Sequence, residues 1–119
     1  MQPYRRLPAL FAEVEAIVRD FIVEYTRGTE FVVLEAGVVP THIHLLVEKA
    51  PWADLIAFVK DFQRQSSVRI FERLPQLALD MRTDRFWTDG GFHYRRHTPA
   101  SLETVRQYIR NQKKHHGLV

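Results

Sequence analysis

Cysteine is absent from this chain of 119 residues. The absence excludes disulfide bonds and thiolate metal sites, and it leaves histidine, carboxylate and amide groups as possible metal ligands. It also favours a reducing compartment, so we expect a cytoplasmic protein. Uninterrupted apolar runs are all much shorter than the roughly 20 residues of a membrane span. No apolar signal core follows the arginines near the N-terminus, so neither membrane insertion nor secretion is expected.

Positive charge is scarce in the first half of the chain and concentrated in the second. Residues 1–59 carry 5 basic and 8 acidic side chains, whereas residues 60–119 carry 12 basic and 6 acidic ones. The aromatic residues Phe86, Trp87, Phe92 and Tyr94 lie among these basic residues, and core packing is the alternative to base stacking for Trp87 and Phe92. Basic and aromatic side chains together suit single-stranded or irregular nucleic acid, because phosphates pair with cations and bases stack on rings. An ordinary solvated basic surface has the same composition.

The apolar pattern predicts one domain over residues 1–119 with three helices. Apolar residues recur every three or four positions over residues 8–26, with Pro8 in the first turn and a stop at Arg27 and Gly28. A second helix is expected from about residue 52 to residue 73, where Pro75 closes it. A third begins near residues 98–99, with Thr98 as its cap, and runs to about residue 115.

Two strands are expected between the first two helices. Residues 30–37 and 40–47 are rich in β-branched and apolar residues, and their short connection favours antiparallel pairing. Ala36 and Gly37 are expected to allow a bend or bulge. Residues 76–98 are the least regular part, with a short hairpin or edge strand that turns at Gly90 and Gly91.

The second of these strands carries His42 and His44. Because side chains alternate along a strand, both imidazoles project from one face, while Ile43, Leu45 and Val47 project from the other. Neutral imidazoles side by side are a ready pair of ligands for a metal ion. Two hydrogen-bonded histidines on a half-exposed sheet face are the alternative, and the pair alone does not decide between them.

The last helix carries a second candidate pair. Tyr108 and Gln112 are four residues apart, so a helix places them on one stripe, with Val105 on the same side. If this stripe packs on the sheet, the phenol and the amide face the two histidines. An ordinary interfacial tyrosine and glutamine would have the same spacing.

Taken in order, these motifs resemble the single-tyrosine HUH transposases of the insertion sequence 200/605 group. Residues 40–47 read PTHIHLLV, and residues 60–67 carry the family's lysine followed by two serines. A Phe-Trp pair at residues 86–87, a Gly-Phe pair at residues 91–92 and YIRNQ at residues 108–112 follow. The resemblance extends from about residue 4 to residue 116. The histidine pair is a weak signal alone, whereas the ordered set is specific.

This resemblance implies an α+β fold, a ferredoxin-like α/β sandwich with an antiparallel sheet and a C-terminal helix that carries the catalytic tyrosine. It implies a DNA transposase that cleaves and rejoins single-stranded DNA at hairpin-marked insertion-sequence ends. Tyr108 corresponds to the nucleophile that forms a 5′-phosphotyrosine, and His42, His44 and Gln112 correspond to the metal ligands. The resemblance implies Mg²⁺ or Mn²⁺, although two histidines alone would favour zinc or another late metal.

The resemblance also implies partners and leaves one feature unmatched. Single-stranded DNA with hairpin ends and a second copy of the chain are the expected partners. The basic residues expected to contact DNA phosphates are Lys60, Arg64, Arg82, Arg85, Arg95 and Arg96. Relatives begin with a strand before the Tyr-Arg-Arg segment, whereas here only three residues precede Tyr4. We therefore expect the first edge strand of the sheet to be absent.

Two other functions remain open from the sequence. A binding domain derived from such an enzyme would hold single-stranded nucleic acid with steep salt dependence and form no covalent product. A small metal-dependent phosphoesterase would use water as the nucleophile, so that Tyr108→Phe would be nearly harmless. The transposase is favoured because both histidines, the tyrosine and the glutamine are present together.

Overall fold

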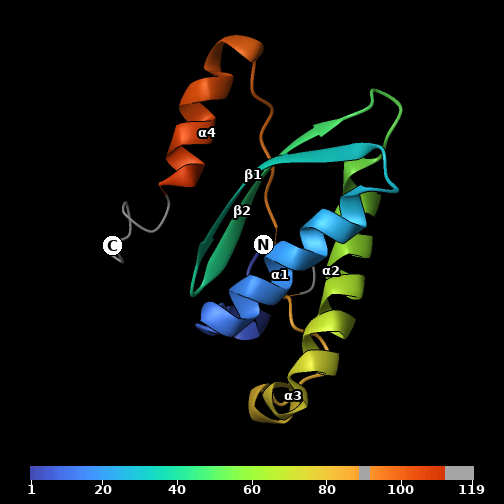
Figure 1. The fold of residues 1–119 in the computed structure, drawn as a ribbon, viewed down its shortest axis with the longest axis vertical. Helices are drawn as coiled ribbons and strands as arrows, with labels where there is room; N and C mark the ends of the chain where they lie inside the picture. The colour runs from blue at the N-terminus through green and yellow to red at the C-terminus, as the bar shows by residue number, and fades with distance from the viewer. Residues whose placement is uncertain (89–91, 112–119) are drawn as a thin grey trace.

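The computed structural model describes residues 1–88 and 92–111. It has an α+β fold in which an antiparallel hairpin lies between two helical layers (Figure 1). The hairpin consists of β1 (Phe31–Val39) and β2 (His42–Lys49). The helices are α1 (Ala12–Thr26), α2 (Leu55–Arg73), α3 (Pro75–Met81) and α4 (Leu102–Arg110), with short 3₁₀ turns at Tyr4–Arg6 and Pro99–Ser101.

The two strands pair in one antiparallel register that is interrupted by a bulge. Val33 lies opposite Val47 and Glu35 lies opposite Leu46, so Leu34 is the extra residue. The bulge therefore comes earlier than the predicted position at Ala36 and Gly37. A bulge shifts the alternation of side chains by one residue, and this shift decides which face Glu35 joins.

The main core lies between the hairpin and the layer of α1 and α2. Ile43 and Val38 face it from the strands, and both are at most 2% exposed. The stripe of α1 that was predicted from periodicity packs there, with Val14 and Val18 fully buried. Aromatic rings fill the space between the helices: Phe21, Tyr25, Phe31, Phe58 and Phe62 contact one another. This face of the hairpin is therefore closed by packing.

No strand precedes α1 in the described residues, as the sequence predicts, yet residues 1–4 occupy a place in the sheet. The Met1 nitrogen donates to the Ile43 carbonyl at 3.0 Å, and the Ile43 N–H donates to the Met1 carbonyl at 2.9 Å. Pro3 forms an antiparallel bridge with Trp87. Residues 1–4 thus lie between β2 and residues 86–88, inside the sheet rather than at its edge, which is the ferredoxin-like order.

Helices α1 and α2 begin later than the sequence pattern predicts, and both end where expected. Leu10 is buried and its N–H donates to the Pro40 carbonyl at 3.0 Å, so the chain is still extended before α1. At α2, the Asp54 carboxylate accepts hydrogen bonds from the N–H groups of Ile56 and Ala57. An N-cap of this kind satisfies donors that a helix leaves unpaired, and it sets the start at Leu55.

Two further predictions about the second half need correction, and two others are not tested. Pro75 not only closes α2 but also begins α3, since proline suits the first turn of a helix. Thr98 does not cap α4, because a 3₁₀ turn intervenes and Ser101 is the N-cap residue. The predicted turn at Gly90 and Gly91, and the expected end of the last helix near residue 115, lie outside the described residues.

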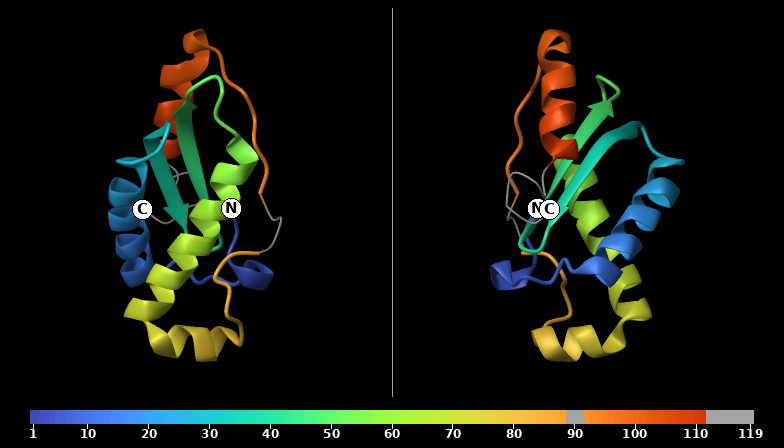
Figure 2. Two further views of the ribbon diagram at one scale, coloured as in Figure 1. Left: turned by 90° about the vertical axis from the view of Figure 1, so that its right-hand side faces the viewer. Right: turned by 60° about the vertical axis from the view of Figure 1, so that its left-hand side comes forward.

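Helix α4 stands apart from the other helices, on the opposite side of the hairpin (Figure 2). It is reached through residues 92–98, which adopt no regular secondary structure and are exposed from residue 93 onward. None of the helices in the described ranges is long and apolar enough to cross a membrane.

Candidate functional site

The two histidines lie side by side on the face of the hairpin that α1 and α2 do not cover. Their ring centroids are 4.8 Å apart, with the rings at 79° to each other. His42 is partly exposed and His44 is exposed. The same-face geometry expected from the strand period is therefore present, and both imidazoles are accessible from that side.

Register determines what surrounds the histidines. Residues directly opposite in neighbouring strands share a face, so Val39 lies beside His42 and Gly37 lies beside His44. Because Gly37 has no side chain, the space next to the His44 ring is not filled from β1. Val39 is 2% exposed and lies directly opposite His42, at the end of the hairpin where β1 passes into β2.

Helix α4 packs on the face of the hairpin that carries the histidines. Leu46, on the same face of β2, is 9% exposed, and Ile109 of α4 is 6% exposed. Val39, Leu46 and Ile109 are buried but do not belong to the main core cluster, which places them in a second apolar layer under α4. The helix runs toward the end of the hairpin where β1 passes into β2 (Figures 1 and 2). The C-terminal end of α4 is thus its end nearer the histidines.

An ion pair joins α4 to the same face. Glu35 Oε1 accepts from Arg110 Nη2 at 2.5 Å and from Arg106 Nε and Nη2 at 3.4 Å. The Glu35 side chain is only 15% exposed. The hydrogen bond from Arg110 holds the pKa of the Glu35 carboxyl below its usual range, with Arg106 adding to the effect. The carboxylate is therefore ionised and held by two guanidinium groups.

Tyr108 lies on α4 between the two arginines in sequence and is 50% exposed. Ile109 faces the sheet, so the neighbouring Tyr108 is at the flank of the contact rather than beneath it. Gln112, the expected partner of Tyr108 one turn further on, lies outside the described residues. The structure thus brings the helix of Tyr108 onto the histidine face and leaves the phenol accessible.

The residues present fit part of a metal site. The Thr41 hydroxyl and His42 Nδ1 are 3.1 Å apart. If Nδ1 is the protonated nitrogen and donates to this hydroxyl, Nε2 is the unprotonated one, which is the form that binds a metal. Within residues 1–88 and 92–111, no three His, Asp or Glu side chains are grouped so as to hold a metal. Among the residues that the structure describes, His42 and His44 therefore supply two ligand positions.

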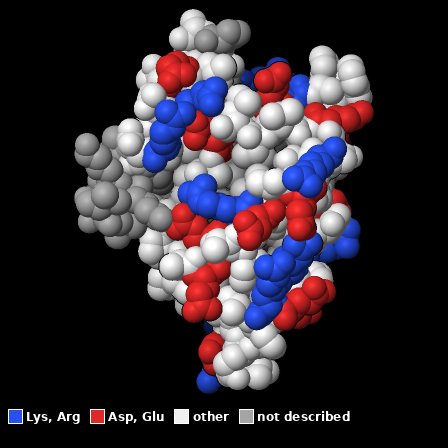
Figure 3. Space-filling view, viewed as in Figure 1, with Lys and Arg blue, Asp and Glu red and all other residues white. Residues whose placement is uncertain are grey.

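The basic residues predicted to contact DNA do not form one surface. Lys60 and Arg64 are exposed on the outer side of α2, in the helical layer that covers the other face of the hairpin. Arg64 pairs with Asp61 at 2.6 Å. The face viewed in Figure 3 shows Lys and Arg interspersed with Asp and Glu rather than one continuous basic patch. On this face, basic side chains therefore lie beside acidic ones rather than gathered on their own.

The remaining predicted contacts are distributed over the second half of the chain. Arg82 is the left-handed C-cap of α3, with φ 57°, and its N–H donates to the carbonyls of Ala78 and Leu79. Arg85 is exposed just before the buried pair at residues 86–87. Arg95 and Arg96 are exposed in the extended segment that leads to α4. Of the six basic residues, these last two lie nearest to Tyr108 along the chain.

Two of the aromatic residues considered for base stacking belong to the core. Phe86 is 0% exposed and Trp87 is 2% exposed. The Trp87 indole N–H donates to Ser66 Oγ at 2.8 Å, and the Phe86 N–H donates to Ser67 Oγ at 3.0 Å. The adjacent serines of α2 therefore hold residues 86–87 against the helical layer. Phe92, by contrast, is partly exposed.

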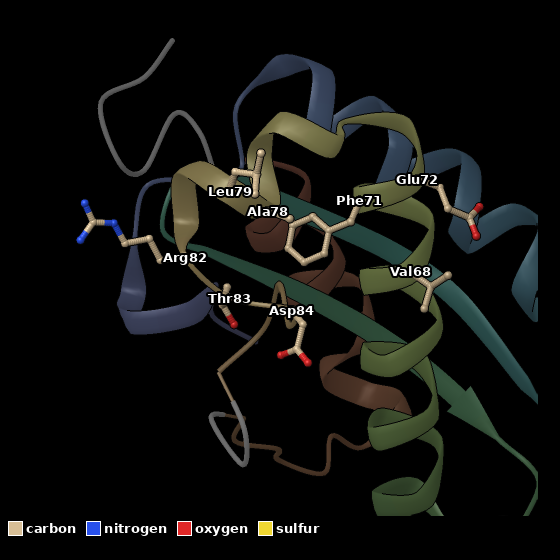
Figure 4. A pocket seen from close by; sticks show the side chains of 8 residues that line it. All are labelled: Val68, Phe71, Glu72, Ala78, Leu79, Arg82, Thr83 and Asp84. Carbon is tan, nitrogen blue, oxygen red and sulfur yellow. The ribbon is translucent and has the colours of Figure 1, made fainter.

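A separate hollow of about 630 Å³ lies between α2 and α3 (Figure 4). Apolar side chains line most of it, and no histidine or tyrosine is among the lining residues, which are Val68, Phe71, Glu72, Ala78, Leu79, Arg82, Thr83 and Asp84. The hollow belongs to the helical layer, on the opposite side of the hairpin from α4. It is therefore not part of the histidine site.

Sequence reasoning missed the group formed by Glu35, Arg106 and Arg110. A glutamate inside an apolar strand and two arginines four residues apart on a helix were the available signals. Neither signal indicates a partner, because their separation in the chain exceeds 70 residues. Only the folded structure brings the three side chains together.

Comparison with known proteins identifies relatives over nearly the whole chain. A family model described as "Transposase IS200 like" matches residues 1–112. The transposase for insertion sequence element IS200 of Salmonella typhimurium is 24% identical over 110 residues, which are 92% of this chain and 71% of that protein. Its counterpart from Salmonella typhi matches equally. The crystal structure of a candidate transposase from Deinococcus radiodurans superposes with a TM-score of 0.73 at 22% identity, over 93% of this chain and 85% of that one.

Proposed function

Because the chain belongs to the family of IS200-like transposases, we propose that it cleaves and rejoins single-stranded DNA at the ends of an insertion sequence with Tyr108 as nucleophile. The observation that carries this proposal is the packing of α4 on the face of the hairpin that presents His42 and His44. A nucleophile and a pair of metal-binding imidazoles on one face are the two parts that a phosphodiester cleavage needs.

In the proposed reaction, the Tyr108 phenolic oxygen forms a bond to phosphorus and the bond from phosphorus to the 3′ oxygen breaks. The phenol loses its proton, and the departing 3′ oxygen takes one up to become a hydroxyl. The DNA then remains attached through a 5′-phosphotyrosine. Because this linkage retains a phosphodiester, a 3′-hydroxyl of another strand can attack it and rejoin DNA without ATP.

His42 and His44 are proposed to hold a divalent cation, Mg²⁺ or Mn²⁺, together with Gln112. A divalent cation in this position would polarise the scissile phosphate and stabilise the negative charge that develops during the attack. Neutral ligands suit that role, because they leave the charge of the cation undiminished. The 4.8 Å separation of the imidazole rings and the bare Gly37 beside His44 support this assignment.

Single-stranded DNA with hairpin ends is the proposed partner. Arg85, Arg95 and Arg96 are exposed on the chain that leads from the core to α4, so phosphates of a bound strand can reach them.

A second copy of the chain is also proposed, as a homodimer. Sedimentation equilibrium that shows monomers alone at high concentration would contradict the dimer and leave the reaction itself untouched.

The test of this function is covalent capture of labelled DNA. Single-stranded oligonucleotides from the ends of the element are incubated with the protein and Mn²⁺ or Mg²⁺, and the products are run on a denaturing gel. We expect a protein–DNA band that disappears in Tyr108→Phe and on chelation. Tyr94→Phe is the matched control, because Tyr94 is also exposed, at 62%, and lies on the segment before α4. This control is expected to keep the band.

Two outcomes would overturn the proposal. Salt-sensitive DNA binding without any covalent band would indicate a binding domain. Cleavage that persists in Tyr108→Phe would indicate a water-dependent phosphoesterase instead.

A further inference from the structure

Glu35 reaches the face under α4 only because of the bulge at Leu34. Val33 faces the main core, and without an extra residue Glu35 would face it too, since side chains alternate. The bulge shifts the alternation, so Glu35 lies opposite Leu46 and on the histidine face. A carboxylate in the aromatic core would carry a large desolvation penalty, whereas on this face it meets two guanidinium groups.

The ion pair constrains α4 in a way that the apolar contact does not. Ile109 fills a space beneath the helix, but apolar packing has little directional preference. Arg106 and Arg110 lie one helical turn apart and both contact Glu35 Oε1, so they fix the helix at two points. Because both arginines lie on one side of α4 and converge on one oxygen, they hold that side of the helix toward β1 and limit its rotation. Tyr108 lies between them.

We propose that Glu35 is a positioning residue that, through Arg106 and Arg110, docks α4 on the histidine face and sets the place of Tyr108. This inference rests on the proposed function for its consequence in catalysis, whereas the docking itself is independent of it. The lowered pKa of the Glu35 carboxyl agrees with a charged group held by the two arginines.

The docking can be measured without any DNA reaction. The chain has no cysteine, so spin labels attach only at introduced positions, and Thr104→Cys on α4 with Val23→Cys on α1 are both exposed sites. Pulsed electron resonance then gives the distance distribution between the labels. Each doubly labelled chain is mixed with an excess of the same chain without labels, so that distances between copies do not contribute. We expect one narrow distribution for the parent protein and a broader or displaced one for Glu35→Gln.

Glu48→Gln is the matched control for this substitution. Glu48 is an exposed carboxylate on the same face of the hairpin, opposite Val32, whereas the ion pairs of Arg106 and Arg110 are with Glu35. The control is expected to leave the label distance unchanged. Arg106→Gln with Arg110→Gln removes the same ion pair from the side of α4 and should reproduce the effect of Glu35→Gln. This second route keeps the test decisive if Glu35→Gln fails to fold.

Cleavage kinetics separate positioning from binding. A displaced nucleophile lowers the rate of the chemical step, by up to about 100-fold for a shift near 1 Å, and it leaves the affinity for DNA unchanged. We therefore expect Glu35→Gln to lower kcat with little change in KM. A general loss of structure would instead change both, together with the thermal unfolding of the whole chain.

Each result has a definite meaning. Label distances and kcat in Glu35→Gln that equal those of Glu48→Gln would overturn the inference. A displaced α4 in Glu35→Gln, in a protein whose parent form captures no DNA, would uphold the docking role and refute the proposed reaction. Unchanged label distances with a lower kcat would refute docking as the cause.

Discussion

The two faces of one hairpin differ in how they are covered. The face toward α1 and α2 is closed by a continuous apolar core in which several side chains have no exposed surface. The face toward α4 has a small apolar layer of Val39, Leu46 and Ile109, an ion pair and two accessible histidines. The first face therefore stabilises the fold. The second face leaves the two histidines accessible, and only a few contacts hold α4 on it. Local changes there can therefore move α4 without unfolding the chain.

The largest expected effect comes from the core face. Phe62 is 0% exposed and contacts Phe21, Tyr25 and Phe58. Phe62→Ala leaves a cavity among these rings and is expected to lower the free energy of unfolding by about 3–5 kcal/mol. Denaturant unfolding measures this loss. Val23→Ala on the exposed side of α1 is the control, with a change within about 0.5 kcal/mol.

A smaller and local effect is expected on the α4 face. Ile109→Ala removes the buried side chain that packs beneath α4, at a cost of about 2 kcal/mol, the low end for such truncations. Hydrogen exchange should show faster exchange of α4 amides, while α1 and α2 amides keep their protection. Thr104→Ala, an exposed position of the same helix, should change neither. Equal acceleration throughout the chain would contradict the difference between the two faces.

The next largest effect is expected from the hydrogen bond between Trp87 and Ser66 in the core. Ser66→Ala leaves the buried Trp87 indole N–H without its acceptor and is expected to destabilise the protein by about 1–3 kcal/mol. Because the two groups form one hydrogen bond, Ser66→Ala and Trp87→Phe together should destabilise less than the sum of the single changes. Additive changes in unfolding free energy would show that the bond contributes nothing.

The smallest expected effect is the response of α4 to acid. Since the Glu35 pKa is lowered in the folded protein, the stability that it contributes is complete above the pKa of an unfolded glutamate, about 4.3. It is lost as the pH falls through the lower pKa of the folded state. We expect the label distance between α4 and α1 to broaden in that range before α1 and α2 lose helicity. Glu35→Gln should abolish this pH dependence.

Prediction from the sequence succeeded where local rules decide the outcome. The alternation of residues 42–47 placed His42 and His44 together, and the apolar period identified the packed stripe of α1. The helix starts were less accurate, because Leu10 and Asp54 form contacts that compete with helix formation. The burial of Phe86 and Trp87 depends on Ser66 and Ser67 of another element, so no local rule could choose core packing over base stacking.

The sequence by itself determined that two histidines share a strand face and that a tyrosine helix follows at the end of the chain, because strand and helix periods fix these relations locally. It also determined the family, since the motifs occur in one order along nearly the whole length. Only the tertiary structure decided that α4 covers the histidine face. The reason is physical: the bulge at Leu34 moves Glu35 to that face, where two arginines more than 70 residues away can reach it.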